Sequence, residues 1–149
     1  ARGEFTPKLS GQIRVGYQVR DFDRGSDDNA FALDGSLNFA YSEKTTYQLN
    51  LSNDFGSSGV GDSTKNSSIG VSTNSKLDEQ WSWNAGLNFK KSKYPTRTDD
   101  YLTGNAGIRF TVNSYLNLEA NYNYQDNGST LASSEFTGNS FGIAANVRY

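Results

Sequence analysis

The sequence contains no cysteine, no methionine and no histidine. Without cysteine the chain can hold neither a disulfide framework nor a thiolate metal site, and without histidine it lacks the side chain that most often serves as a general base. Proline is scarce as well, with 2 residues in 149, and no proline-rich or low-complexity linker divides the chain. We therefore expect one domain without disulfides or imidazole chemistry.

Long apolar runs are also missing. No run approaches the ~18 residues of a membrane-spanning helix, hydrophobic residues make up 34% of the chain, and the mean hydropathy is -0.71. These values are typical of a soluble protein, but a strand of a transmembrane β-barrel needs only about 10 residues, of which every second one is apolar. The net charge of -2 leaves no basic surface for nucleic acid. The chain begins with Ala1 rather than Met, as a processed or trimmed product would.

Apolar and polar residues alternate with the period of a β-strand along eight stretches. In the last of them Phe141, Ile143, Ala145, Val147 and Tyr149 share one face, and small or polar residues occupy the other. A strand of this kind suits either the edge of a soluble sandwich or the closing strand of a transmembrane barrel. The other seven stretches lie at 8–20, 31–41, 47–55, 69–77, 81–89, 102–112 and 116–124.

The connections between these stretches alternate in length. Outer-membrane barrels place long loops outside the cell and tight turns in the periplasm, and an even number of strands puts both termini in the periplasm. We therefore predict an all-β fold: an eight-stranded antiparallel up-and-down transmembrane β-barrel over residues 8–149, with short periplasmic turns, longer extracellular loops and a tail at 1–7. The long loops are at 21–29, 56–62, 92–100 and from 126 onward, and the tight turns are at 42–45, 78–79 and 113–114.

The two faces of the predicted strands differ in charge. About 40 residues fall on the apolar face and none is charged, whereas a composition with 20% charged residues would place about eight there. Either a protein core or lipid excludes charge in this way, so alternation alone leaves a soluble barrel open. The opposite face holds mostly small neutral residues such as Ser36, Asn88 and Asn105. Such residues suit a narrow polar lumen better than a soluble surface, which prefers Lys and Glu.

Charged residues on the polar face occupy positions where they can pair. Folding the chain about the turn at 113–114 brings Arg109 opposite Glu119, and Arg20 falls diagonal to Asp34 across the first loop. Because buried charges are tolerated when they are paired, this pattern predicts ion pairs in a lumen. Surface pairs worth under ~1 kcal/mol are the alternative. The predicted lumen set is Arg14, Arg20, Asp34, Lys90, Arg109 and Glu119.

Aromatic residues gather near both ends of the predicted strands, as the two interfaces of a bilayer require. Tyr41 and Tyr47 flank one short turn and Trp81 follows another, whereas other aromatics lie toward the long loops. The predicted aromatic girdle consists of Tyr41, Tyr47, Trp81, Phe55, Phe89, Tyr124 and Tyr149.

The terminal Tyr149 and the alternating residues before it resemble the carboxy-terminal signal of Gram-negative outer-membrane barrels, which implies that the barrel-assembly machinery is a partner. The stretches at 16–21, 97–101 and 121–126 more narrowly resemble the β-barrel porin type 2 family, which often accompanies exopolysaccharide export. Members of that family are usually much larger. This chain would then be a small relative, or a fragment or re-engineered version of a larger barrel.

We expect an outer-membrane barrel with a side-chain-filled polar lumen and a structural or surface-display role, because eight strands leave no open channel. The alternative is a pore or export component within a larger or multi-chain barrel; a soluble small-molecule binder would need an apolar cavity. No enzyme activity is expected, since no histidine or buried lysine activates the many serines. No cofactor or metal is expected either, and the acidic loop at 21–28 lacks the Glu that completes an EF-hand. The expected partner is a lipid bilayer or detergent.

Overall fold

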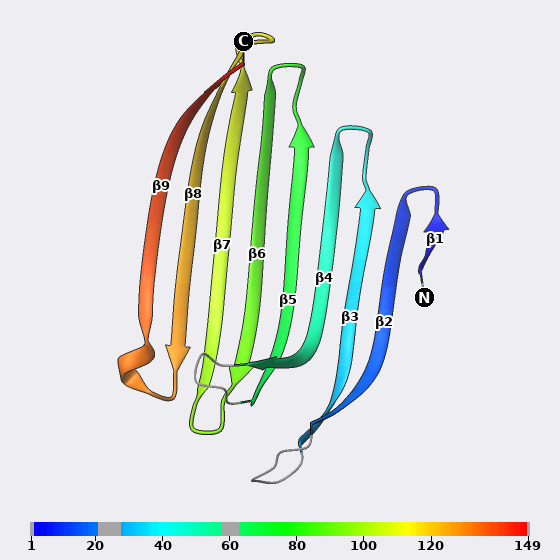
Figure 1. Cartoon of the computed structure of the whole chain (residues 1–149). Helices are drawn as coiled ribbons and strands as arrows, with labels where there is room; N and C mark the ends of the chain where they lie inside the picture. The colour runs from blue at the N-terminus through cyan, green and yellow to red at the C-terminus, as the bar shows by residue number, and fades with distance from the viewer. Residues whose placement is uncertain (1, 21–27, 58–62, 149) are drawn as a thin grey trace.

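The computed structural model describes residues 2–20, 28–57 and 63–148, with side chains except at 2, 18–20, 28–30, 55–57 and 63. Within these ranges it contains one antiparallel sheet of nine strands in the order β1 to β9 (Figure 1). A short 3-10 helix, η1 (Ala132–Ser134), lies between the last two strands. The strands are β1 (Arg2–Thr6), β2 (Leu9–Arg20), β3 (Asp28–Ala40), β4 (Thr45–Ser57), β5 (Ser63–Lys76), β6 (Trp81–Lys93), β7 (Thr98–Thr111), β8 (Leu116–Ser129) and β9 (Phe136–Val147).

The all-β, antiparallel, up-and-down arrangement is confirmed, but the predicted number of eight strands is wrong. Residues 2–6 form β1 instead of a tail, and Gly3 pairs with Gly11 of β2. This segment has no apolar alternation because an edge strand needs only backbone hydrogen bonds to its neighbour. The described ranges therefore hold nine strands.

The described residues form an open, curved sheet rather than the closed barrel that was predicted. Within them β1 pairs only with β2, and β9 pairs only with β8 (Figure 1). Because β1 pairs only with the stretch from Leu9 to Gln12, no described strand pairs with the outer edge of β2 over residues 14–20. Open strand edges present unpaired N–H and C=O groups, so this sheet still has backbone hydrogen-bonding capacity at both ends.

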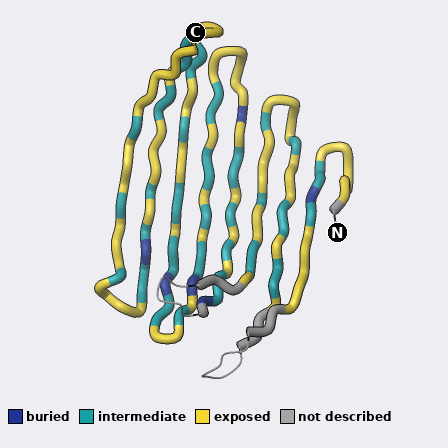
Figure 2. The backbone as a smooth tube through the Cα atoms, in the orientation of Figure 1, coloured by how far each residue is buried: buried dark blue, intermediate teal, exposed yellow. Residues whose placement is uncertain are grey.

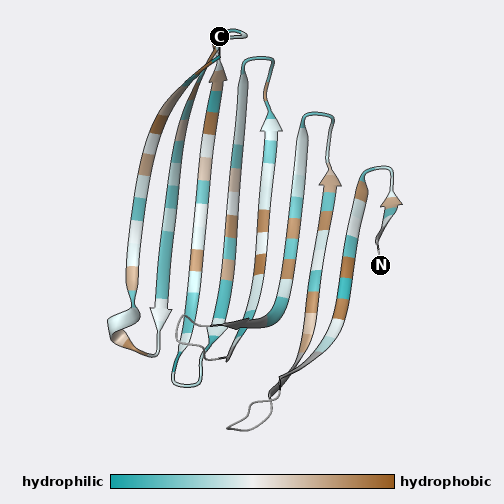
Figure 3. Ribbon diagram, in the orientation of Figure 1, coloured by the Kyte–Doolittle hydropathy of each residue, from teal (hydrophilic) through white to brown (hydrophobic). Residues whose placement is uncertain are grey.

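The register confirms the two predicted faces. One row of paired residues crosses the sheet through Leu37, Leu49, Val71 and Leu87, and all four lie on the apolar face. Brown and teal residues alternate along the strands in Figure 3. The apolar face is exposed: Leu87 is 59% exposed and Ile143 is 75% exposed.

Burial is the reverse of that in a soluble domain. The two largest fully buried side chains among the described residues are polar, Asp99 and Ser92. Figure 2 shows few buried residues along the strands, which are mostly intermediate or exposed. A soluble sandwich would bury its large apolar side chains, so this apolar face requires a cover that the sheet itself does not supply. No helix among the described residues is long and apolar enough to cross a membrane.

The strands extend further than predicted toward the long loops. β6 runs to Lys93 and β8 runs to Ser129, whereas loops were expected from 92 and from 126. The loops expected at 21–29 and 56–62 lie partly outside the described residues. The strand extensions add charge to the apolar face, so the charge-free description holds only for its middle part. The charged residues at this end of that face are Lys65, Lys91, Lys93, Asp100 and Asp126.

All three predicted short turns are confirmed, and each uses a side-chain oxygen to accept two backbone N–H groups. Ser42 Oγ accepts from Lys44 and Thr45 at 3.2 and 3.1 Å. Asp78 Oδ1 accepts from the N–H groups of residues 80 and 81 at 2.8 and 2.7 Å. Asn113 Oδ1 does the same for residues 115 and 116, both at 2.9 Å. These local bonds define the hairpins independently of the rest of the sheet.

We predict that Gly11→Ala lowers the free energy of unfolding by about 1–2 kcal/mol. A Cβ at Gly11 would lie 2.7 Å from the backbone oxygen of Ser36 and 2.7 Å from Leu37 Cδ2, and a carbonyl in a paired strand cannot move away. Urea unfolding of the protein refolded in detergent measures the change. The control is Gly16→Ala in the same strand, where the nearest atom is 3.8 Å away. Equal stability of the two variants would contradict the close approach of β2 and β3 at Gly11.

Candidate functional site

The polar face of the sheet carries four pairs in which an asparagine lies across a glycine of the neighbouring strand. A Cβ built on the glycine would lie 2.9 Å from the asparagine Oδ1 in the first pair and 2.7 Å from it in the other three. The lack of a glycine side chain therefore lets each amide group lie flat along the sheet. The result is an uncharged surface rich in hydrogen-bonding groups. The pairs are Gly70 with Asn88, Gly86 with Asn105, Gly107 with Asn84, and Gly142 with Asn121.

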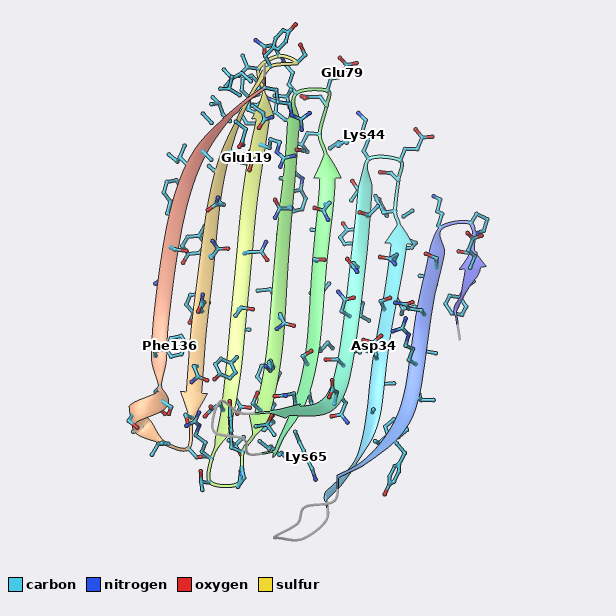
Figure 4. The ribbon with its side chains drawn as sticks, viewed as in Figure 1. Asp34, Lys44, Lys65, Glu79, Glu119 and Phe136 are labelled. Carbon is cyan, nitrogen blue, oxygen red and sulfur yellow. The ribbon has the colours of Figure 1, made fainter. Side chains whose placement is uncertain are left out.

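An ion pair lies on the polar face near the short turns. Arg109 of β7 and Glu119 of β8 are register partners, as predicted, and Arg109 Nε donates to Glu119 Oε1 at 2.7 Å. The two side chains are 56% and 28% exposed, so the pair is open to water. It borders a recess of about 390 Å³ that also contains Lys44, Lys76 and Glu43. Figure 4 shows Glu119 and Lys44 on neighbouring parts of this end of the sheet.

The predicted pairing of Arg20 with Asp34 is wrong. The register partner of Asp34 is Arg14, and the partner of Arg20 is Asp28. The register, not the strand length, sets these partners, and in it Arg20 lies six residues along β2 from Arg14, too far for a diagonal contact with Asp34. The side chain of Arg20 lies outside the described residues. Lys90 occupies the polar face as predicted, with Ser68 and Tyr101 as its register partners.

The aromatic residues at the short-turn end of the apolar face are in contact. The rings of Tyr41 and Tyr47 lie 6.3 Å apart in a T-shaped arrangement, and those of Trp81 and Phe110 lie 4.5 Å apart. Phe89, toward the long loops, is 42% exposed.

The other members of the predicted girdle are less defined. Tyr124 is half-buried beside Gly104, in the middle of the sheet. The side chain of Phe55, and Tyr149 as a whole, lie outside the described residues. Phe136, labelled in Figure 4, is the register partner of Asn127 and belongs to the polar face.

A buried carboxylate near the long loops was missed by the sequence reading. Asp99 is 0% exposed; its Oδ2 accepts from Arg97 Nε at 3.0 Å and its Oδ1 accepts from Ser129 Oγ at 2.6 Å. Tyr101 OH donates to Oδ2 at 3.4 Å. The hydrogen bond to Asp99 raises the pKa of the Arg97 guanidinium, which also lies 4.4 Å from the centre of the Tyr94 ring.

The Asp99 cluster is part of a larger buried polar region at this end of the polar face. Ser92 is 1% exposed and donates to Asn66 Oδ1 at 2.7 Å, and Asn127 is 3% exposed and donates to the Ser134 carbonyl oxygen at 2.6 Å. The alternation of Arg97, Asp99 and Tyr101 is the signal that could have revealed the cluster, because every second residue of a strand shares a face.

Comparison with known proteins places this geometry among outer-membrane barrels. A family model described as "Putative beta-barrel porin 2" matches residues 1–149. The outer-membrane expressed OmpT of Vibrio cholerae is similar in structure, with a TM-score of 0.66 and 15% identity, over 95% of this chain and 52% of that chain. OmpTdeltaL8, a loop L8 deletion mutant of the same protein, is similar with a TM-score of 0.67 and 14% identity, over 95% of this chain and 50% of that chain. No curated protein sequence matches the chain. This chain shares the fold of these structures and spans about half of their length.

Proposed function

This chain belongs to the "Putative beta-barrel porin 2" family, and on that premise we propose that it forms part of the wall of a water-filled pore in the bacterial outer membrane. The polar face would line the channel, and the apolar face would contact lipid. The pore would act by passive passage of solutes rather than by catalysis.

One observation carries this proposal: the nine-stranded sheet has a polar and an apolar face, yet it does not close on itself within the described residues. A closed barrel of eight strands is filled by its own side chains, whereas barrels of 16–18 strands leave an aqueous channel. Because the chain covers 52% of a larger outer-membrane protein of the same fold, its sheet fits as roughly half of such a wall. This favours the pore over the plugged display barrel that the sequence suggested first.

The proposed orientation follows from the strand lengths. A tilted transmembrane strand needs about 9–11 residues, and β5, β7 and β8 each have 14. The additional strand residues lie at the long-loop end, where charged residues appear on the apolar face. We place the long loops outside the cell, the short turns in the periplasm, Tyr41, Tyr47 and Trp81 of the predicted girdle at the periplasmic interface, and Phe89 toward the outer one. Insertion by the barrel-assembly machinery is part of the same proposal.

Cysteine labelling tests which face lines the channel, because the chain has no cysteine of its own. Ser72 and Val71 are neighbours in β5 on opposite faces: Ser72 pairs with Gly86, and Val71 pairs with Leu87. We expect the refolded protein to give stable current steps in a planar bilayer. A charged, membrane-impermeant thiol reagent should lower the current of Ser72→Cys and leave that of Val71→Cys unchanged.

Two results would count against the pore, and a third against the assignment of its faces. Folding and insertion without current steps would favour a structural or display barrel. Equal block of both cysteine variants would show that the two faces are not separated by a lipid boundary. Block of Val71→Cys alone would reverse the assignment of the faces. Heat-shifted mobility on a gel, measured for each variant, shows that the variant has folded.

A further inference from the structure

One row of register partners on the polar face carries more positive than negative charge. It crosses the sheet from β2 to β9 toward the long-loop end, and its charged members are Arg14, Asp34 and Lys90. Arg14 and Asp34, the latter labelled in Figure 4, are register partners of opposite sign, so one positive charge remains at Lys90. The full row is Arg14, Asp34, Ser52, Ser68, Lys90, Tyr101, Asn127 and Phe136.

The next two rows toward the short turns contain no charged residue from β2 to β9. The first row is Gln12, Ser36, Asn50, Gly70, Asn88, Thr103, Gln125 and Gly138, and the second is Ser10, Asn38, Gln48, Ser72, Gly86, Asn105, Asn123 and Ser140. Beside them β1 adds Arg2 and Glu4, whose charges sum to zero. The charge of Lys90 therefore adjoins a neutral stretch of the polar face.

The carboxylates nearest to Lys90 on this face do not pair with it. Asp99, one row nearer the long loops, is fully buried and accepts from Arg97 Nε at 3.0 Å and from Ser129 Oγ at 2.6 Å. Asp54 belongs to the same row as Asp99 but lies two strands from Lys90, about 12 Å between Cα atoms from the spacing and rise of strands. Among the described residues, the ion pairs are Lys91 with Asp100, Arg97 with Asp99 and Arg109 with Glu119.

Lys90 also lies where the outer face of the sheet is still apolar. Phe89, the preceding residue of β6, points to the apolar face and is 42% exposed. Its register partner on β7, Leu102, is 40% exposed on the same face. If lipid covers these residues, the wall behind Lys90 has a low dielectric constant, and such walls focus the field of a charge into the water-filled space in front of them.

We propose that Lys90 makes the channel selective for anions. The inference rests on the proposed pore and names the class of solute that the pore favours. An anion that enters from the long-loop end would be attracted by the Lys90 ammonium group, and a cation would be repelled by it. Lysine and arginine side chains that line a pore act in this way in anion channels. Beyond Lys90 the two uncharged rows would neither hold the anion nor repel it.

The test is the reversal potential of the refolded protein in a planar bilayer under a tenfold gradient of potassium chloride. Near about 0.1 M salt, where the Debye length is about 10 Å, we expect the parent to pass chloride in preference to potassium. Lys90→Gln should lower the permeability ratio of chloride to potassium about threefold, and Lys90→Glu about tenfold. Lys90→Arg should retain the ratio of the parent.

The salt concentration separates an effect of charge from a change in channel width. Near about 1 M salt the Debye length falls to about 3 Å, so the difference between Lys90→Gln and the parent should largely disappear. A difference of the same size at both concentrations would overturn the proposal, because screening does not change the width of a channel.

The matched control is Lys91→Gln, which removes the same charge from the adjacent residue. Lys91 points to the apolar face and forms an ion pair with Asp100, so its substitution should leave the permeability ratio unchanged. An equal change in Lys91→Gln and Lys90→Gln, or an unchanged ratio in both Lys90→Gln and Lys90→Glu, would overturn the role of Lys90 and leave the pore standing. Absence of current steps in the folded parent would overturn the pore and this inference together.

Discussion

Leu87→Arg is expected to lower the free energy of unfolding of the membrane-inserted protein by about 2–4 kcal/mol. Leu87 lies on the apolar face, is 59% exposed, and sits in the middle of β6 between Val71 and Gly104. An arginine at the midplane would have to carry its charge into hydrocarbon or distort the bilayer around it. Urea unfolding in lipid vesicles, followed by the fluorescence of the two tryptophans, measures the loss.

The depth dependence of this cost gives the control. Leu77 is 56% exposed, almost as much as Leu87, but it lies in the short turn after β5. Leu77→Arg should therefore cost only about 0–1 kcal/mol, because arginine is tolerated near the interface. If both variants lost the same stability, the apolar face would not cross the hydrocarbon of a bilayer. If neither did, water would cover that face.

The two faces and the short turns could be predicted because they depend on local rules. A strand alternates its side chains with a period of two, so the row through Leu49, Val71 and Leu87 follows from spacing alone. Asp78 and Asn113 make their turns with N–H groups two and three residues ahead. Neither feature depends on residues that are distant in the sequence.

Strand ends, sheet edges and register could not be predicted in the same way. Backbone pairing continues through Lys93 and Ser129, where apolar alternation has stopped, and β1 pairs without any alternation. The partner of Asp34 depends on the register between β2 and β3, which alternation does not fix because a shift by two residues keeps every side chain on its own face; the partner is Arg14. Apolar patterns record contact with lipid, and they stop where the strands leave it.

The buried carboxylate of Asp99 could not be predicted without the register of three neighbouring strands. Asp99 pairs with Ser92 on one side and with Ser129 on the other. In the sequence it belonged to a stretch with many turn-forming residues. Only the register shows that a neighbouring side chain, Ser129, can donate a hydrogen bond to its carboxylate. The cluster is therefore a test of the structure itself rather than of the sequence pattern.

Asp99→Asn is expected to lower the free energy of unfolding by about 1.5–3 kcal/mol. The substitution keeps the shape of the side chain but removes the charge that accepts from Arg97, Ser129 and Tyr101. It also introduces an NH₂ group toward at least one of these donors. Because the side chain is 0% exposed, water cannot replace the lost bonds. Urea unfolding in detergent micelles, compared with the parent protein, measures the loss.

The neighbouring residue provides the matched control for this substitution. Asp100 faces the opposite side of β7 and forms an ion pair with Lys91. The side chains of Asp100 and Lys91 are 44% and 43% exposed. Asp100→Asn should therefore change the free energy of unfolding by less than about 1 kcal/mol, since exposed ion pairs contribute little. A larger loss in Asp100→Asn than in Asp99→Asn would mean that the two faces of β7 are exchanged at this end. The polar face near the long loops would then be the exposed one, and its buried region would not exist.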